Sequence, residues 1–192
     1  MTDQELIQAY LKGDDRAFNS LVRRYHKPVY NYLLKMVGSR EDADDLAQTV
    51  FIRCCTSLKK LKDQQRFAPW LYRIAANLAR DHWRARKETV SFDQYCEEAN
   101  PLAEILLSND DPLNAAAAEQ RAEIVRKALL MIPFEQRETL ILKMYQSLKF
   151  SEIAEALGEP LNTVKSRLYY GLSAMKKILQ SWNLEELRHY EM

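Results

Sequence analysis

The chain has 192 residues, of which 47% are hydrophobic and 29% charged, with only four glycines and six prolines. This composition excludes fibrous, collagen-like and wholly disordered proteins and indicates a helix-rich chain of one large or two small domains. The formal net charge of +1, from 28 basic and 27 acidic residues, would by itself argue against a nucleic-acid partner.

The charges are unevenly distributed along the chain. Residues 53–87 carry 10 basic and 2 acidic side chains, a net charge of +8, whereas residues 88–123 carry 1 and 9, a net charge of −8. A basic block is therefore followed directly by an acidic one. This asymmetry is typical of a polyanion-binding surface beside a segment that repels or mimics polyanions.

The sequence shows no sign of a membrane span, an export signal or a metal site. No apolar run reaches the roughly 18 residues that a bilayer span needs, and the N-terminus has no cationic-then-apolar signal. The three cysteines, Cys54, Cys55 and Cys96, form neither a disulfide framework nor a zinc pattern. We therefore expect a cytoplasmic protein in a reducing compartment, with no metal or other cofactor.

Helical periodicity dominates the first half of the chain and predicts an all-α fold. Helices are expected over residues 3–12, 15–37 with an interruption near Pro28, 41–62 with Ser39 as N-cap, and 69–87 with Pro69 in the first turn. Cys54 lies on the apolar stripe of the third helix, so we expect its thiol to pack rather than react.

The second half begins with a change of composition. Residues 88–112 are acidic, contain two prolines and have no sustained periodicity, which indicates an interdomain linker. Asp111 as N-cap and Pro112 then start a helix to Ile132, followed by helices over residues 133–148, 151–157 with Ser151 as N-cap, and 163–179. We therefore predict two small helical domains, with boundaries at 1–87, 88–112 for the linker, 113–180, and 181–192 for a C-terminal tail.

The most specific local pattern lies between Ser151 and Leu179. An apolar face on the first helix, Gly158 at a tight turn and an apolar stripe on the next helix (Val164, Leu168, Leu172, Met175) are typical of a helix-turn-helix. The donors and aromatic residues left on outward or flanking faces are Thr163, Lys165, Ser166, Arg167, Tyr169 and Tyr170. These side chains could meet base edges and phosphates. The alternative is an ordinary αα-hairpin with a solvated basic face.

A second pattern is a polar stripe on the helix from Pro69. Arg73, Asn77, Arg80 and Arg84 recur at steps of four, three and four, which places them on one exposed face. Guanidinium groups neutralise phosphates, the amide can read a base edge, and nearby rings such as Phe67 could stack on an unstacked base. A solvated arginine-rich helix, with all the rings in the core, explains the pattern equally well.

A third surface lies on the polar face of the helix from residue 41. Asp42, Asp45, Gln48, Thr49 and Ile52 are not needed for its core stripe, and Ile52 is an apolar residue left outside. This face could bind a partner protein, although scattered exposed apolar residues are normal. No phosphate loop, nucleophile arrangement or carboxylate cluster is present, so we expect neither an enzyme nor a small-molecule substrate.

Three segments resemble the sigma-70 superfamily of bacterial transcription initiation factors, and more narrowly its extracytoplasmic-function (ECF, group IV) branch. Residues 44–51 (DDLAQTVF) resemble the core-polymerase-binding motif of region 2.2, and residues 67–81 (FAPWLYRIAANLARD) are similar to regions 2.3 and 2.4. Residues 152–158 (EIAEALG) with 163–167 (TVKSR) resemble the helix-turn-helix of region 4.2. The motifs occur in the family's order, and the resemblance covers about residues 14–180.

The resemblance implies a dissociable sigma subunit that binds core RNA polymerase and recognises and melts promoter DNA. Polymerase would be contacted at the β′ clamp helices and the β flap, with the clamp-helix contacts made by Asp42, Asp45, Leu46, Gln48, Phe51 and Ile52. The minus-ten element would be bound, with capture of a flipped base, by Arg66, Phe67, Arg73, Asn77, Arg80 and Arg84. The minus-thirty-five element would be read by Thr163, Lys165, Ser166, Arg167, Tyr169 and Tyr170.

The resemblance further implies an anti-sigma factor, often membrane-anchored in relatives, and a linker that threads the polymerase channels. Two residues depart from the family pattern: Thr49 stands where a carboxylate is usual, and Cys55 where Trp is frequent. The first puts one polymerase contact in doubt, and the second suggests altered packing more than thiol-based regulation. Two other hypotheses are a two-domain helix-turn-helix regulator that never enters polymerase and a purely structural helical interaction protein.

Overall fold

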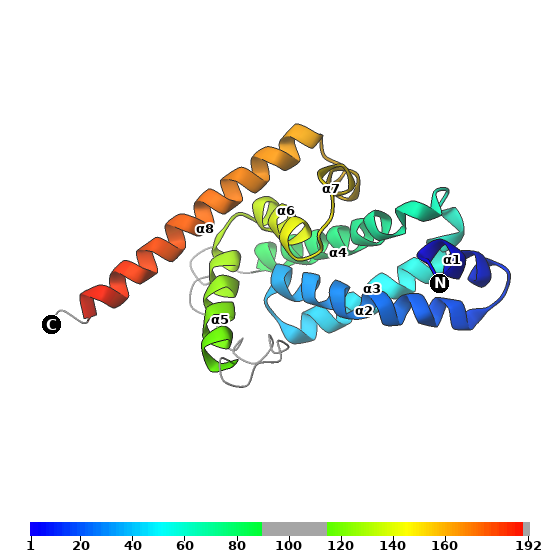
Figure 1. The fold of residues 1–192 in the computed structure, drawn as a ribbon, viewed down its shortest axis with the longest axis horizontal. Coiled ribbons are helices and arrows are strands. Elements are labelled where there is room, and N and C mark those ends of the chain that lie inside the picture. Colours follow the sequence, from blue (N-terminus) through cyan, green and yellow to red (C-terminus); the bar gives the residue numbers. More distant parts are fainter. Residues whose placement is uncertain (90–114, 190–192) are drawn as a thin grey trace.

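The structure is a computed structural model that describes residues 1–89 and 115–189, and Figure 1 shows its fold. Within these two ranges the chain contains helices and no strand, which confirms the all-α prediction. The elements are α1 (Asp3–Leu11), α2 (Asp15–Val37), α3 (Arg40–Ser57), two short 3-10 helices (Leu58–Lys60 and Gln64–Arg66), α4 (Phe67–Thr89), α5 (Ala115–Met131), α6 (Phe134–Met144), α7 (Phe150–Leu157) and α8 (Leu161–His189). None of the helices in the described part is long and apolar enough to cross a membrane.

Helices α1 to α4 form the first helical group. Ser39 caps α3 as predicted, because its hydroxyl accepts a hydrogen bond from the backbone N–H of Asp42 at 3.3 Å. The predicted apolar stripe of α3 faces α2 and α4, and Cys54 on that stripe is fully buried. This burial confirms a packing role for Cys54 and raises the pKa of its thiol to about 12.

The largest differences from the predicted helices in this group are at Pro28 and at the end of α3. Pro28 lies inside a continuous α2 and does not interrupt it. The residues that follow it (Val29, Tyr32, Leu33) are fully buried, so tertiary packing outweighs the backbone hydrogen bond that a proline removes. Helix α3 ends at Ser57 and passes into a 3-10 turn, rather than continuing to Lys62.

Helices α5 to α8 form the second group, and their ends and caps agree only partly with the prediction. Helix α6 ends at Met144, short of the predicted Leu148, and Ser147 follows in the left-handed region at φ 54°. The predicted cap Ser151 lies inside α7, which begins after Lys149; the Lys149 N–H donates to the Glu152 carboxylate at 2.6 Å. Helix α8 continues well past Leu179 to His189.

The crossing of α6 and α8 depends on a glycine. A Cβ at Gly171 would lie 3.3 Å from the Cβ of Gln136, so the absence of a side chain lets the two helices approach closely. Gly171 is buried, whereas Leu172, predicted to face inward, is 46% exposed. The inner stripe of α8 therefore runs through Val164, Gly171 and Met175.

The two groups pack against each other over a shared apolar core. Helix α4 lies against α7, and α2 lies against α5 and α6, while the C-terminal end of α8 extends beyond the other helices (Figure 1). The buried Arg137 of α6 joins the ends of two helices, because it donates to the carbonyls of Met36 on α2 at 2.7 Å and Leu130 on α5 at 2.9 Å. The predicted linker at 88–112 lies outside the described residues, apart from the end of α4, as do Cys96 and Asp111.

Candidate nucleic-acid interface

Helices α7 and α8 adopt the predicted helix-turn-helix. Gly158 ends α7 in the left-handed conformation at φ 67°, as a residue without a Cβ does readily. Helices α7 and α8 pack against each other, and Ile153, Ala156 and Leu157 on α7 and Val164 on α8 are buried. The N-terminal half of α8 is thereby held at a fixed angle to α7, as a recognition helix requires.

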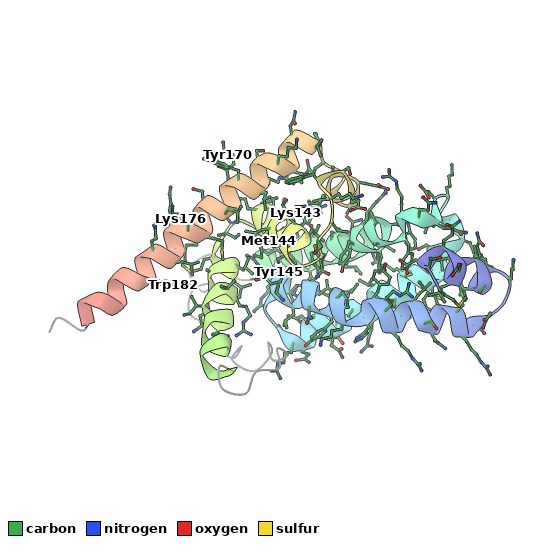
Figure 2. The ribbon with its side chains drawn as sticks, in the orientation of Figure 1. Lys143, Met144, Tyr145, Tyr170, Lys176 and Trp182 are labelled. Carbon is green, nitrogen blue, oxygen red and sulfur yellow. The ribbon has the colours of Figure 1, made fainter. Side chains whose placement is uncertain are left out.

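The outer face of α8, which we call the α8 face (Thr163, Lys165, Ser166, Arg167, Tyr169, Tyr170), is largely open to solvent. Tyr169 and Tyr170 are 69% and 59% exposed, and their rings meet edge to face at 5.7 Å. Figure 2 shows Tyr170 on the side of α8 turned away from the other helices. Arg167 differs from its neighbours because it is half-buried and its guanidinium bonds to Glu159 at 3.0 Å.

The predicted stripe on α4, which we call the α4 stripe (Arg73, Asn77, Arg80, Arg84), is only partly exposed. Arg73, Asn77 and Arg84 face solvent. Arg80 does not, because its Nη2 donates to both carboxylate oxygens of Glu138 on α6, at 3.1 and 3.3 Å. The prediction that all four residues lie on one exposed face is therefore wrong for Arg80.

The residues at the start of α4 have contrasting environments. Arg66 is exposed, and its guanidinium pairs with Glu155 of α7 and lies 3.7 Å from Asp63. The ring of Phe67 is only 1% exposed and packs edge-on against Tyr25 at 5.2 Å. In this arrangement the Phe67 ring contributes to the core, and no base can stack on it unless the start of α4 moves.

The outer side of α3, which we call the α3 face (Asp42, Asp45, Leu46, Gln48, Phe51, Ile52), combines polar and apolar side chains. Asp45 and Gln48 are exposed, and Ile52 is 64% exposed. Phe51 is 8% exposed and stacks on His26 at 6.0 Å, while Leu46 is half-buried. Asp42 is turned toward α4, where its carboxylate lies 3.4 Å from His82 and 3.8 Å from Arg86.

Two carboxylates that the sequence analysis missed complete this region. Glu138 is fully buried and Glu155 half-buried, and each holds an arginine from the first helical group. Burial raises the pKa of Glu138 to about 7, in spite of the opposing effect of Arg80. A signal was available, because Glu138 shares the apolar stripe of α6 with Phe134 and Ile141, and a carboxylate there requires a buried partner.

In the part of the chain that the structure describes, no group of three or more histidine, cysteine or acidic residues could hold a metal ion. Cys55 is half-buried, and its sulfur lies 3.1 Å from the hydroxyl of Tyr10.

Both helical groups match known protein-family models. Residues 21–89 match the family model "Sigma-70 region 2", and residues 122–175 match "Sigma-70, region 4". The first match ends with α4 and the second includes the helix-turn-helix of α7 and α8.

Curated proteins and solved structures agree with these matches. The chain is 30% identical to the ECF RNA polymerase sigma factor SigW of Bacillus subtilis, over 94% of this chain and 98% of that protein. It is 31% identical to the ECF RNA polymerase sigma-E factor of Escherichia coli K12, over 94% and 95%.

Among solved structures, the fold is similar to CnrH in complex with the cytosolic domain of CnrY, with a TM-score of 0.70 and 23% identity over 93% of this chain and 97% of that one. It is also similar to the sigma factor RpoE of Bartonella quintana in complex with the anti-sigma factor NepR, with a TM-score of 0.65 and 17% identity over 85% and 96%.

Proposed function

This chain belongs to the sigma-70 family, in its ECF branch of RNA polymerase sigma factors, and from that premise we propose how its residues divide the work of promoter recognition. Residues 1–87 bind core polymerase and the minus-ten element, and residues 113–180 bind the minus-thirty-five element. The acidic linker at 88–112 passes through the polymerase channels. The observation that carries this proposal is an exposed amide, Asn77, set among arginines on α4 in the same chain as an exposed recognition helix.

The α8 face is proposed to bind the minus-thirty-five element in the major groove. Lys165, Tyr169 and Tyr170 are exposed near the N-terminal half of α8, which is the part of a recognition helix that meets base edges. Lys165 can neutralise a phosphate, and Arg167 can form a bidentate contact with a guanine once it leaves Glu159.

The α4 stripe, with Arg66 and Phe67, is proposed to bind the non-template strand of the minus-ten element. Arg73 and Arg84 would hold phosphates, because they are exposed in this structure. Asn77 would hydrogen-bond a base that has left the stack, with the loop at 63–67. Unstacking costs a few kcal/mol, so polymerase contacts and phosphate neutralisation must offset it.

The α3 face is proposed to dock on the clamp helices of the polymerase β′ subunit, and the second domain on the β flap. Asp45, Gln48 and Ile52 form the exposed centre of the α3 face. We also propose an anti-sigma factor as a regulatory partner, since RpoE of Bartonella quintana was solved with one. Together these proposed roles are those of a transcription initiation factor that acts in the cytoplasm and has no catalytic residue of its own.

Promoter-specific run-off transcription with core RNA polymerase tests the proposal. The templates are promoters from a genome-derived library. We expect a transcript that depends on both the chain and the promoter. Duplex binding without any transcript would instead favour a helix-turn-helix regulator that acts outside polymerase. That alternative leaves the α3 face and the α4 stripe without a role.

A further inference from the structure

Two arginines proposed to bind the minus-ten strand are held by carboxylates of the second helical group. Arg80 donates to both oxygens of Glu138, and Arg66 is paired with Glu155. The two carboxylates lie on α6 and α7, whereas the two arginines lie at the middle and just before the start of α4. Both pairs therefore exist only while the two helical groups are in contact, which we call the closed arrangement.

Other contacts along α4 maintain the closed arrangement. The hydroxyl of Tyr72 donates to Gln146 at 2.5 Å, and the Gln146 amide donates to the carbonyl of Pro28 on α2 at 3.3 Å. Further along α4, the ring of Trp83 packs on Phe134 at 5.1 Å. Tyr72, Arg80 and Trp83 share one face of α4, and Arg73, Asn77 and Arg84 lie on the neighbouring exposed face.

The chemistry of these pairs matches that of a nucleic-acid contact. A guanidinium binds a carboxylate and a phosphate through the same charge-assisted N–H···O hydrogen bonds. We propose that Glu138 and Glu155 occupy the positions of DNA phosphates, so that the closed arrangement withholds Arg80 and Arg66 from single-stranded DNA until the two helical groups separate. The inference rests on the proposed function, because it takes α4 as the strand-binding helix.

The two pairs differ in how DNA can displace them. The side chains of Arg66 and Glu155 are 52% and 36% exposed, so a phosphate can replace Glu155 without other movement. The side chain of Glu138 is not exposed, and that of Arg80 is 24% exposed. A phosphate can reach Arg80 only after α6 has moved away from α4, and Glu138 is therefore the main barrier to strand binding.

Charge reversal on the second group tests this inference in the full chain without polymerase. The probe is a fluorescent random-sequence single-stranded DNA 12-mer, because phosphate contacts do not depend on sequence. Glu155→Lys is expected to raise affinity about twofold to fivefold, and Glu138→Lys about tenfold or more. Glu135→Lys is the matched control, because Glu135 is an exposed residue on the same helix as Glu138 and its replacement changes the charge by the same amount. Equal gains in all three variants would overturn the proposal.

Two further measurements separate this inference from its alternatives. Adding Arg80→Ala to the Glu138→Lys chain should abolish most of the gain, and a gain that persists would contradict the role of Arg80. Small-angle scattering should show expansion for Glu138→Lys but not for Glu135→Lys. If Glu138→Lys loses its helical circular dichroism, the test rests on Glu155→Lys alone. In that case, an affinity gain for Glu155→Lys that is no larger than the gain for Glu135→Lys overturns the inference. Run-off transcription by the wild-type chain reports on the proposed function separately.

Discussion

The carboxylate of Glu138, with none of its side chain exposed, receives both of its hydrogen bonds from one nitrogen of Arg80. Burial is the largest influence on the Glu138 carboxyl, and it raises the pKa of this group from the ordinary value of 4.5 to about 7. The groups that face it are Arg80 on α4, Tyr32 on α2 and Arg167 on α8, with Glu135 on its own helix. The closed arrangement thus holds a carboxyl group that is half-protonated near neutral pH.

Closure should therefore weaken as the pH rises. When the helical groups separate, water reaches Glu138 and its pKa returns toward 4.5, so the closed arrangement binds the proton more tightly. The stabilisation of closure is complete below about pH 4.5 and is lost as the pH rises to about 7. Within that window the ratio of open to closed chain should rise by about tenfold per pH unit.

The emission of Trp83 can follow this transition, because its ring packs on Phe134 across the interface. In a Trp70→Phe/Trp182→Phe chain, a red shift between pH 5 and 8 is expected. Glu138→Gln keeps an acceptor for Arg80 but cannot ionise, so it should remove the pH dependence. The same pH dependence in the Glu138→Gln chain would assign it to another group.

Asn77→Ala should impair promoter opening more than polymerase binding. The lost amide contact to a base is worth about 1–3 kcal/mol, whereas the α3 face is untouched. Permanganate reactivity of minus-ten thymines measures opening, and core affinity is measured in parallel. Asn19→Ala, which removes an exposed amide on α2, is the control. Equal losses of opening and core affinity for Asn77→Ala would argue against base recognition.

Arg167→Ala and Lys165→Ala should have different effects on duplex binding. Arg167 can read a guanine, so its loss should weaken binding and relax specificity in the upstream element. Lys165 is exposed and can neutralise a phosphate without reading a base, so its loss should weaken binding to all sequences alike. It should also reduce the slope of log affinity against log salt by about 1. Selection of duplexes from a random pool by each variant measures its sequence preference. An unchanged sequence preference for Arg167→Ala would contradict the major-groove assignment.

Cys54→Ser should destabilise the fold more than Cys55→Ser. The thiol of Cys54 is fully buried among apolar side chains, and an unpaired hydroxyl there costs about 1–3 kcal/mol. Cys55 is half-buried beside the Tyr10 hydroxyl, which a serine can also bond. Urea unfolding compares the two variants. A thiol reagent should modify Cys55 before Cys54, because the raised pKa of Cys54 leaves almost no thiolate.

Local features of this fold could be predicted from the sequence, and contacts between distant helices could not. The cap at Ser39 and the burial of Cys54 depend on residues within a few turns, and both were predicted correctly. Local propensity predicts a break at Pro28, because it takes no account of the buried residues that surround this proline. The helical spacing predicts an exposed Arg80, because its partner Glu138 is 58 residues away in the chain and does not enter a local pattern.

Helix α8 has a mechanical consequence, because it is a single helix of 29 residues. At 1.5 Å per residue it is about 43 Å long, and a tilt of about 10° would displace one end by about 7 Å. Tyr169 lies in the N-terminal third of α8. Trp182 lies further along, on the side toward α5 (Figure 2). Under the proposed function, packing at Trp182, which is remote from the DNA, would help to set the angle at which Tyr169 meets a duplex.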